Sequence, residues 1–208
     1  MILYVNGDSN SSGAELEDIS NAWPNYLSKK LSWTLVNHAA SGCSNDRIYR
    51  TTTDYINSLT NYDNLYIIIG WTSWEREEWL VDGEYYQVNA SGMNYFPTAD
   101  LRERYKNWMA NYDPDITTVR GNHKWHGKIW DLHQTLSSKG IPHLFFNATM
   151  CLKDNNIKDW GNNYIHPYDN NYAYQWFLKN HGFRWTDGYH HREDAQKFWG
   201  DYLYDTIC

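Results

Sequence analysis

The chain has 208 residues, which is long enough for one domain with a full hydrophobic core, and we expect a single domain over residues 1–208. Its longest purely aliphatic run is Ile67-Ile68-Ile69, and its mean hydropathy is −0.78, which excludes a membrane-spanning helix. The 25 Asp and Glu residues outnumber the 18 Lys and Arg residues, and the net charge of −7 opposes binding to the phosphates of nucleic acids.

Apolar runs alternate with amphipathic stretches in the first third of the chain. The patterns predict strands over residues 2–6, 33–37 and 64–69, and helices over residues 14–30 and from 44 to about 59. The third strand has no polar alternation, which is typical of a central parallel strand covered on both faces. The strand and helix order therefore predicts a parallel sheet between two layers of helices, an α/β/α fold.

The middle of the chain is less regular. Residues 81–97 are predicted to leave the sheet, as a hairpin from Val81 to Val88 around Asp82-Gly83 followed by a loop from Asn89 to Pro97. Excursions of this kind often line a binding site. Further helices are predicted over residues 98–109, 117–138, 168–179 and from 192 to about 204, with a fourth strand over 142–146.

Gly7-Asp8-Ser9 follows the first predicted strand, at the sheet edge where open α/β folds bind ligands. A serine on such a turn projects its hydroxyl outward and is a candidate nucleophile. Backbone N–H groups and the helix dipole nearby favour negative charge beside it. The competing interpretation is a turn in which Asp8 or Ser9 caps a helix.

Asp187-Gly188-Tyr189-His190 places a carboxylate three residues before a histidine near the carboxyl terminus. This spacing allows the carboxylate to reach Nδ1 of His190 while Nε2 faces a serine on another loop. Ser9, His190 and Asp187 are therefore predicted to form a catalytic triad. The alternative is a loop before a helix with an incidental histidine.

The order of these motifs resembles that of the SGNH (GDSL-type) hydrolase family over nearly the whole chain. Gly7-Asp8-Ser9 is similar to its first block, Gly42 to the glycine of the second, and Asp187 to His190 to the last. The third block of the family is Gly-x-Asn, whereas this chain has Gly70-Trp71-Thr72-Ser73. That string resembles the third block of GDSL-like proteins of tailed phages.

The resemblance implies a flavodoxin-like three-layer fold and an esterase or deacylase without metal or organic cofactor. It also implies an oxyanion hole built from the N–H groups of Ser9 and Gly42 and a third donor. Because the family asparagine is missing, we expect a hydroxyl of Thr72 or Ser73 to be that donor. The alternative is a catalytically silent binding or interaction protein on the same scaffold, encoded by a phage.

Other groups of reactive residues have simpler explanations. His123, His126 and His133 lack a Cys or carboxylate at a known metal-ligand spacing, so we expect a polar surface there and no metal site. Glu75 to Glu78 is interpreted as a solvated helix start, and Cys43 as a small packing residue.

The predicted substrate is a small-molecule or carbohydrate ester, an O-acetyl sugar being the specific expectation. The aromatic residues that could flank the site are Trp71, Trp74, Trp79, Tyr85 and Tyr86. No nucleic acid or membrane is expected as a partner. The three cysteines lack paired spacing and the first residues form a strand in place of a signal peptide, so we expect a reducing, cytoplasmic location.

Overall fold

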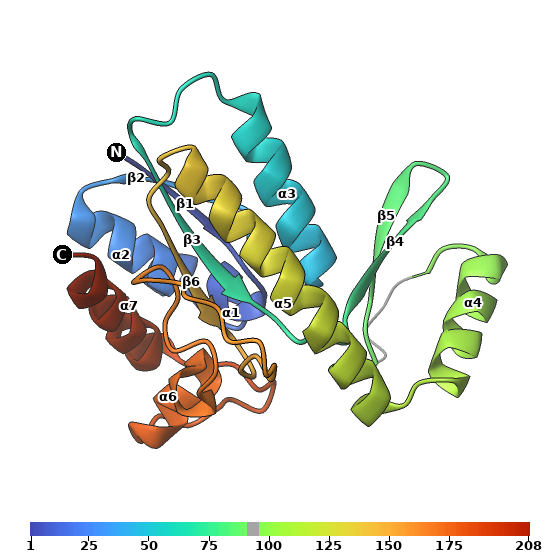
Figure 1. Ribbon diagram of the computed structural model, residues 1–208. Coiled ribbons are helices and arrows are strands. Elements are labelled where there is room, and N and C mark those ends of the chain that lie inside the picture. Colours follow the sequence, from blue (N-terminus) through green and yellow to red (C-terminus); the bar gives the residue numbers. More distant parts are fainter. Residues whose placement is uncertain (91–95) are drawn as a thin grey trace.

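The computed structural model describes residues 1–90 and 96–208 and is built on a four-stranded sheet (Figure 1). The strands are β1 (Ile2–Asn6), β2 (Thr34–Asn37), β3 (Leu65–Trp71) and β6 (His143–Asn147). They lie in the order β2-β1-β3-β6, and every neighbouring pair is parallel. Their carboxyl ends therefore meet at one edge of the sheet.

Helices cover both faces of this sheet (Figure 1). They are α1 (Ser9–Ser12), α2 (Trp23–Leu31), α3 (Asn45–Ser58), α5 (Pro114–Ser138), α6 (Tyr174–Asn180) and α7 (Glu193–Ile207), with short 3₁₀ turns at Ile19–Asn21 and Asn170–Tyr172. No helix within the described residues is long and apolar enough to span a membrane.

Alternation along the central strands divides the core into two layers. Leu3 and Val5 of β1 pack with residues of α2, α6 and α7, whereas Tyr4 packs with residues of α3 and α5. Successive strand residues point to opposite faces, so a strand that is apolar throughout needs cover on both sides. The observed layers confirm the three-layer α/β/α fold.

A separate small layer projects from one side of the sheet, formed by β4 (Glu77–Val81), β5 (Glu84–Val88) and α4 (Ala99–Ala110) (Figure 1). The strands pair antiparallel around Asp82 and Gly83. Both have positive φ, of 52° and 86°, as a type I′ turn requires. Trp79, Val88, Phe96 and Leu101 form a core of their own.

The hairpin thus begins at Glu77 in the segment that was predicted as a solvated helix start, and that prediction was wrong. Of the predicted loop over residues 89–97, residues 91–95 lie outside the described part of the chain.

The predicted helix over residues 14–30 was also wrong in its first half. Pro24 is in the first turn of α2, which begins at Trp23. Proline lacks an N–H and is tolerated only in the first turn of a helix, so it starts this helix and does not kink a longer one.

The histidines of α5 depart from the expected polar surface. The His123 side chain is 87% exposed, but His126 and His133 are buried. His126 lies within 2.9 Å of the Tyr168 hydroxyl, and His133 Nδ1 lies 2.9 Å from Nε2 of His143. One side of α5 faces the sheet, so these two residues are core groups satisfied by hydrogen bonds.

Candidate active site

Ser9 begins α1 immediately after β1, at the carboxyl edge of the sheet. Asp8 is the N-cap, and its Oδ1 accepts a hydrogen bond from the Asn10 N–H at 3.0 Å. Gly7 is required here because a Cβ would lie 2.5 Å from Ser11 Oγ. The capping interpretation of Gly-Asp-Ser is therefore confirmed, since Asp8 caps the short helix. Ser9 begins that helix with 9% of its surface exposed, and its role as a nucleophile stays a prediction.

The loop after β3 does not supply the predicted hydroxyl donor. Thr72 is fully buried, and its hydroxyl donates to Asp8 Oδ2 at 3.1 Å. Its backbone N–H and carbonyl are both bound by the side-chain amide of Asn45. The Ser73 hydroxyl instead lies 3.4 Å from Thr149 Oγ1. The assignment of Thr72 and Ser73 to the oxyanion hole is therefore corrected: their hydroxyls stabilise the loops behind Ser9.

His190 lies in the loop before α7 with its ring partly exposed. Its Nδ1 is 3.2 Å from Oε2 of Glu15, a residue that sequence analysis did not single out. Nδ1 makes no hydrogen bond of good geometry within the described residues. The Thr186 hydroxyl donates to the same Glu15 oxygen. That hydrogen bond and the contact with His190 lower the pKa of the Glu15 carboxyl from its usual value, so it remains an anion.

The predicted acid, Asp187, does not occupy this place. It is exposed and makes no hydrogen bond or ion pair with His190 in the described structure. The reason is a tight turn in which Thr186 N–H donates to the His190 carbonyl and Tyr189 N–H donates to the Thr186 carbonyl. Asp187 lies at the tip of this turn, facing solvent. The predicted contact between Asp187 and His190 is therefore not formed in the described structure, and the carboxylate beside His190 Nδ1 is that of Glu15.

Gly188 makes the approach of Glu15 possible. A Cβ on Gly188 would lie 1.6 Å from Glu15 Oε1, so any side chain there would displace the carboxylate. Glu15 and Tyr189 both have positive φ, of 65° and 66°. Non-glycine residues adopt this conformation at an energetic cost, and such strain is concentrated at functional sites.

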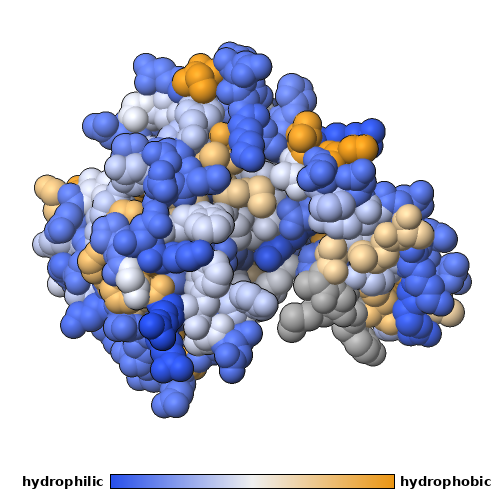
Figure 2. All heavy atoms as spheres, turned by 90° about the horizontal axis from the view of Figure 1, so that it is seen from below, coloured by the Kyte–Doolittle hydropathy of each residue, from blue (hydrophilic) through white to orange (hydrophobic). Residues whose placement is uncertain are grey.

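Ser9 and His190 line one cavity of about 580 Å³ at the carboxyl edge of the sheet. Gly42 and Asn89 also line it, and Tyr85, Tyr86, Gln87, Tyr189, Arg76 and Gln175 complete most of its wall. No hydrogen bond joins Ser9 to His190 in the described residues; catalytic hydrogen bonds often tighten only when substrate binds. Figure 2 shows the molecule from below, and its surface is mainly hydrophilic, with apolar residues in small groups.

Two neighbouring reactive groups are unsuited to catalysis. His191 is 1% exposed, its Nε2 accepts from the Trp185 indole at 2.9 Å, and burial lowers its pKa to about 4. Burial and the nearby Asp8 raise the pKa of the Cys43 thiol to about 12, which keeps it from forming a thiolate. Cys43 is therefore a packing residue, and His190 is the only one of the two adjacent histidines placed to exchange a proton.

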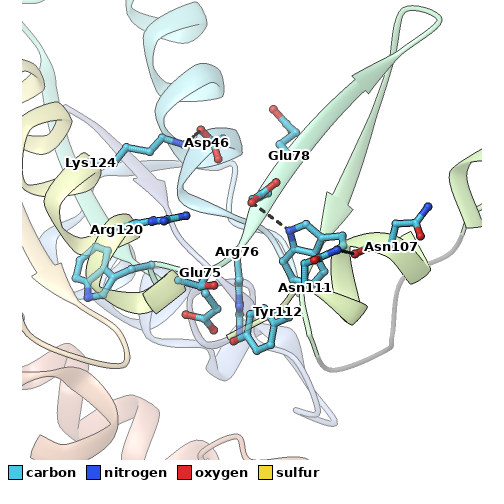
Figure 3. Close-up of a pocket in the computed structure, with 14 residues that line it drawn as sticks. Asp46, Glu75, Arg76, Glu78, Asn107, Asn111, Tyr112, Arg120 and Lys124 are labelled. Atoms are coloured by element: carbon cyan, nitrogen blue, oxygen red, sulfur yellow. Dashed lines mark hydrogen bonds and ion pairs between the residues drawn. The ribbon is translucent and has the colours of Figure 1, made fainter. Parts of the chain in front are cut away.

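A larger cavity of about 780 Å³ lies beside the hairpin, between β4, α4 and the start of α5 (Figure 3). It has charges of both signs, and several are already paired: Lys124 with Asp46 at 2.8 Å, and Glu78 with Arg50 at 2.8 Å. Its lining contains no histidine or cysteine and no serine. Arg76 lines both cavities, but Ser9 and His190 line only the smaller one.

Sequence analysis missed Glu15 and Asn89 at this site. Glu15 lies in a stretch predicted as helix, and no motif marks it. Asn89 follows the hairpin, in the segment expected to line the site, so its position was a signal that could have been used. Of the aromatic residues predicted to flank the site, Tyr85 and Tyr86 line the cavity, while Trp71, Trp74 and Trp79 are buried in the cores.

Comparison with known proteins gives a family for most of the chain. A family model described as "Family of unknown function (DUF6071)" matches residues 4–151. The chain belongs to this family. The DUF6071 match includes Ser9, Gly42 and Asn89 and ends before His190. No curated protein matches the chain.

Solved structures that include an esterase and a lipolytic protein of the G-D-S-L family share the fold of this DUF6071 chain. The psychrotrophic esterase EstA from Pseudoalteromonas sp., inhibited by monoethylphosphonate, aligns with a TM-score of 0.55 and 12% identity over 99% of this chain and 96% of that chain. TesA aligns with a TM-score of 0.53 and 14% identity over 100% of this chain and 98% of that chain. A G-D-S-L family lipolytic protein from Veillonella parvula aligns with a TM-score of 0.53 and 9% identity over 99% of this chain and 97% of that chain.

At these identities the similarity establishes the fold, which is that of SGNH hydrolases. The resemblance to phage proteins finds no support in these comparisons.

Proposed function

We propose that this protein is a serine hydrolase that cleaves an ester through an acyl-serine intermediate. The observation that carries the proposal is the cavity shared by Ser9 and His190, with the Glu15 carboxylate 3.2 Å from His190 Nδ1. A hydroxyl and an imidazole that line one cavity, with a carboxylate beside the imidazole, are the groups that nucleophilic catalysis by serine needs.

In the proposed first step, Ser9 Oγ attacks the ester carbonyl carbon while His190 Nε2 takes the hydroxyl proton. The carbonyl oxygen becomes an oxyanion, which the N–H groups of Ser9 and Gly42 stabilise. Glu15 stabilises the imidazolium and keeps the neutral ring in the tautomer with its proton on Nδ1. His190 then gives the proton to the departing alcohol, leaving the acyl group on Ser9.

The second step is hydrolysis of this acyl-serine. His190 takes a proton from water as the water oxygen attacks the acyl carbon, and returns it to Ser9 Oγ as the carboxylic acid leaves. The net reaction consumes one ester and one water and gives one alcohol and one acid.

We propose a carbohydrate ester, such as an O-acetyl sugar, as the substrate. Tyr85, Tyr86 and Tyr189 line the cavity, and tyrosine side chains combine stacking area with hydrogen bonding. Arg76 adds a positive charge, and it makes no ion pair with a carboxylate in the described residues. A polar, sugar-like alcohol with a small acyl group fits this lining better than a long acyl chain does.

Labelling and turnover test the proposal together. We expect a fluorophosphonate probe to label wild-type protein at Ser9, located by peptide mass spectrometry, and p-nitrophenyl acetate to be hydrolysed. Ser9→Ala is expected to abolish both while the thermal melting temperature stays close to wild type, because the hydroxyl makes no hydrogen bond with the residues that the structure describes. Undiminished hydrolysis by Ser9→Ala would reject Ser9 as the nucleophile.

The second candidate function is binding without catalysis. It is favoured by one observation: the position of the family asparagine is occupied by Thr72, whose hydroxyl is bound to Asp8. A wild-type protein that neither reacts with the probe nor hydrolyses acetyl esters, but binds an acetylated sugar in calorimetry, would establish this function in place of hydrolysis.

A further inference from the structure

An oxyanion hole of two backbone N–H groups is short of one donor by the standard of the SGNH family. Losing one such donor typically costs about 10² to 10³ in rate. The loop after β3 cannot supply it, because the Thr72 hydroxyl is bound to Asp8 and Ser73 does not line the cavity. A third donor must therefore come from another element that reaches Gly42.

The β4–β5 hairpin is such an element, and Asn89 at its end is a polar residue that can donate hydrogen bonds. It directly follows β5, is 8% exposed, and lines the cavity together with Ser9, Gly42 and His190. Its amide Nδ2 would lie 3.9 Å from a Cβ placed on Gly42, and no other heavy atom of the described residues comes within 4 Å of that point. The amide therefore lies beside Gly42 at the wall of the cavity.

Two contacts fix the end of β5, one with the Gly42 loop and one with α4. Gln87 Oε1 accepts a hydrogen bond from the Ser44 N–H at 2.8 Å, two residues after Gly42. The Tyr105 hydroxyl donates to the Asn89 carbonyl at 3.0 Å. Between these contacts, Val88 is fully buried in the core of the hairpin layer. The backbone that carries Asn89 is therefore held from both sides, as preorganised donors require.

Gln87 is itself held from behind. Its Nε2 donates to Glu78 Oε1 at 2.7 Å, and Glu78, labelled in Figure 3, forms a two-pronged ion pair with Arg50 of α3. The hairpin is thereby tied to the helix that follows the Gly42 loop, so this excursion from the sheet has a role in building the site.

We propose that Asn89 Nδ2 is the third oxyanion donor, supplied by the hairpin in place of the asparagine that the SGNH family carries after the third strand. This proposal rests on the proposed hydrolase function. An amide N–H brings the same donor chemistry as the missing residue, delivered from a different element of the chain. The hairpin then completes the catalytic centre.

Steady-state hydrolysis of p-nitrophenyl acetate by Asn89→Ala and Asn89→Asp tests the assignment. We expect Asn89→Ala to lower kcat by about 10² to 10³ with little change in KM, because the donor acts on charge that develops in the transition state. Asn89→Asp keeps the size but places a carboxylate beside the oxyanion, so its loss should be at least as large. Ser73→Ala, which removes a hydroxyl outside the cavity, is the matched control and should retain wild-type kcat.

The rate of fluorophosphonate labelling at Ser9 separates this proposal from the proposed function. Attack on the probe also develops negative charge on oxygen, so Asn89→Ala should label at Ser9 more slowly than wild type, with its melting temperature close to wild type. Labelling and turnover equal to wild type would overturn the role of Asn89 and leave the hydrolase intact. If the wild-type protein neither labels nor turns over, both proposals fail together. A larger loss of kcat in Ser73→Ala than in Asn89→Ala would also overturn the role of Asn89.

Discussion

Replacing Glu15 by glutamine tests which carboxylate acts with His190. The substitution keeps the size of the side chain and removes its charge. An amide N–H facing His190 Nδ1 favours the tautomer with the proton on Nε2, which cannot accept the Ser9 proton. The loss of charge also removes the stabilisation of the imidazolium. We therefore expect kcat to fall while KM changes little.

The structure sets the size of this loss. In serine proteases, where the acid is buried, the corresponding Asp→Asn change lowers kcat by about 10⁴. Here the Glu15 side chain is 41% exposed, and its contact with the ring is not a hydrogen bond of good geometry. Solvent screens an exposed pair of this kind, so we expect a loss of about 10- to 100-fold. Hydrolysis of p-nitrophenyl acetate measured at saturating substrate gives kcat directly.

The matched control is Asp187→Asn, which removes the neighbouring exposed carboxylate and should change kcat by less than about twofold, as surface changes away from a site do. If Asp187→Asn lowers kcat tenfold or more and Glu15→Gln does not, the reasoning from this geometry is refuted.

Three further substitutions have separate expected outcomes. In Gly188→Ala the added Cβ would lie 1.6 Å from Glu15 Oε1, so the carboxylate must move and kcat should fall about as far as in Glu15→Gln; wild-type kcat would contradict this. Thr72→Val leaves Asp8 Oδ2 buried without its partner, so denaturant titration should show about 1 to 3 kcal/mol less stability, while kcat stays near wild type; a large kcat loss at unchanged stability would return the hydroxyl to the oxyanion hole. Burial lowers the pKa of His143 to about 4. Because the unfolded value is about 6.5, the unfolded chain binds the proton more readily between these values, and the melting temperature should fall as the pH is lowered from about 6.5 towards 4. His143→Gln should reduce that slope, and an equal slope would exclude this histidine as its source.

The sequence by itself determined the layers of the fold. The apolar run of β3 requires cover on both faces, and Ser44 begins α3 as its N-cap, with its hydroxyl accepting from the Arg47 N–H. Gly7-Asp8-Ser9 marks the carboxyl end of β1. These features depend on the period of side chains along a strand or helix and on capping within one turn, so neighbouring residues suffice to predict them.

Only the tertiary structure decided which polar groups meet around Ser9. Glu15 reaches His190 from the opposite end of the chain because Gly188 leaves it room, and Asn89 reaches Gly42 because the hairpin is bound to the loop before α3. Such contacts join loops whose paths are set by the packing of whole elements, and no local pattern encodes them. The three-residue spacing allowed the Asp187 carboxylate to contact His190, but the turn between the two residues points Asp187 to solvent.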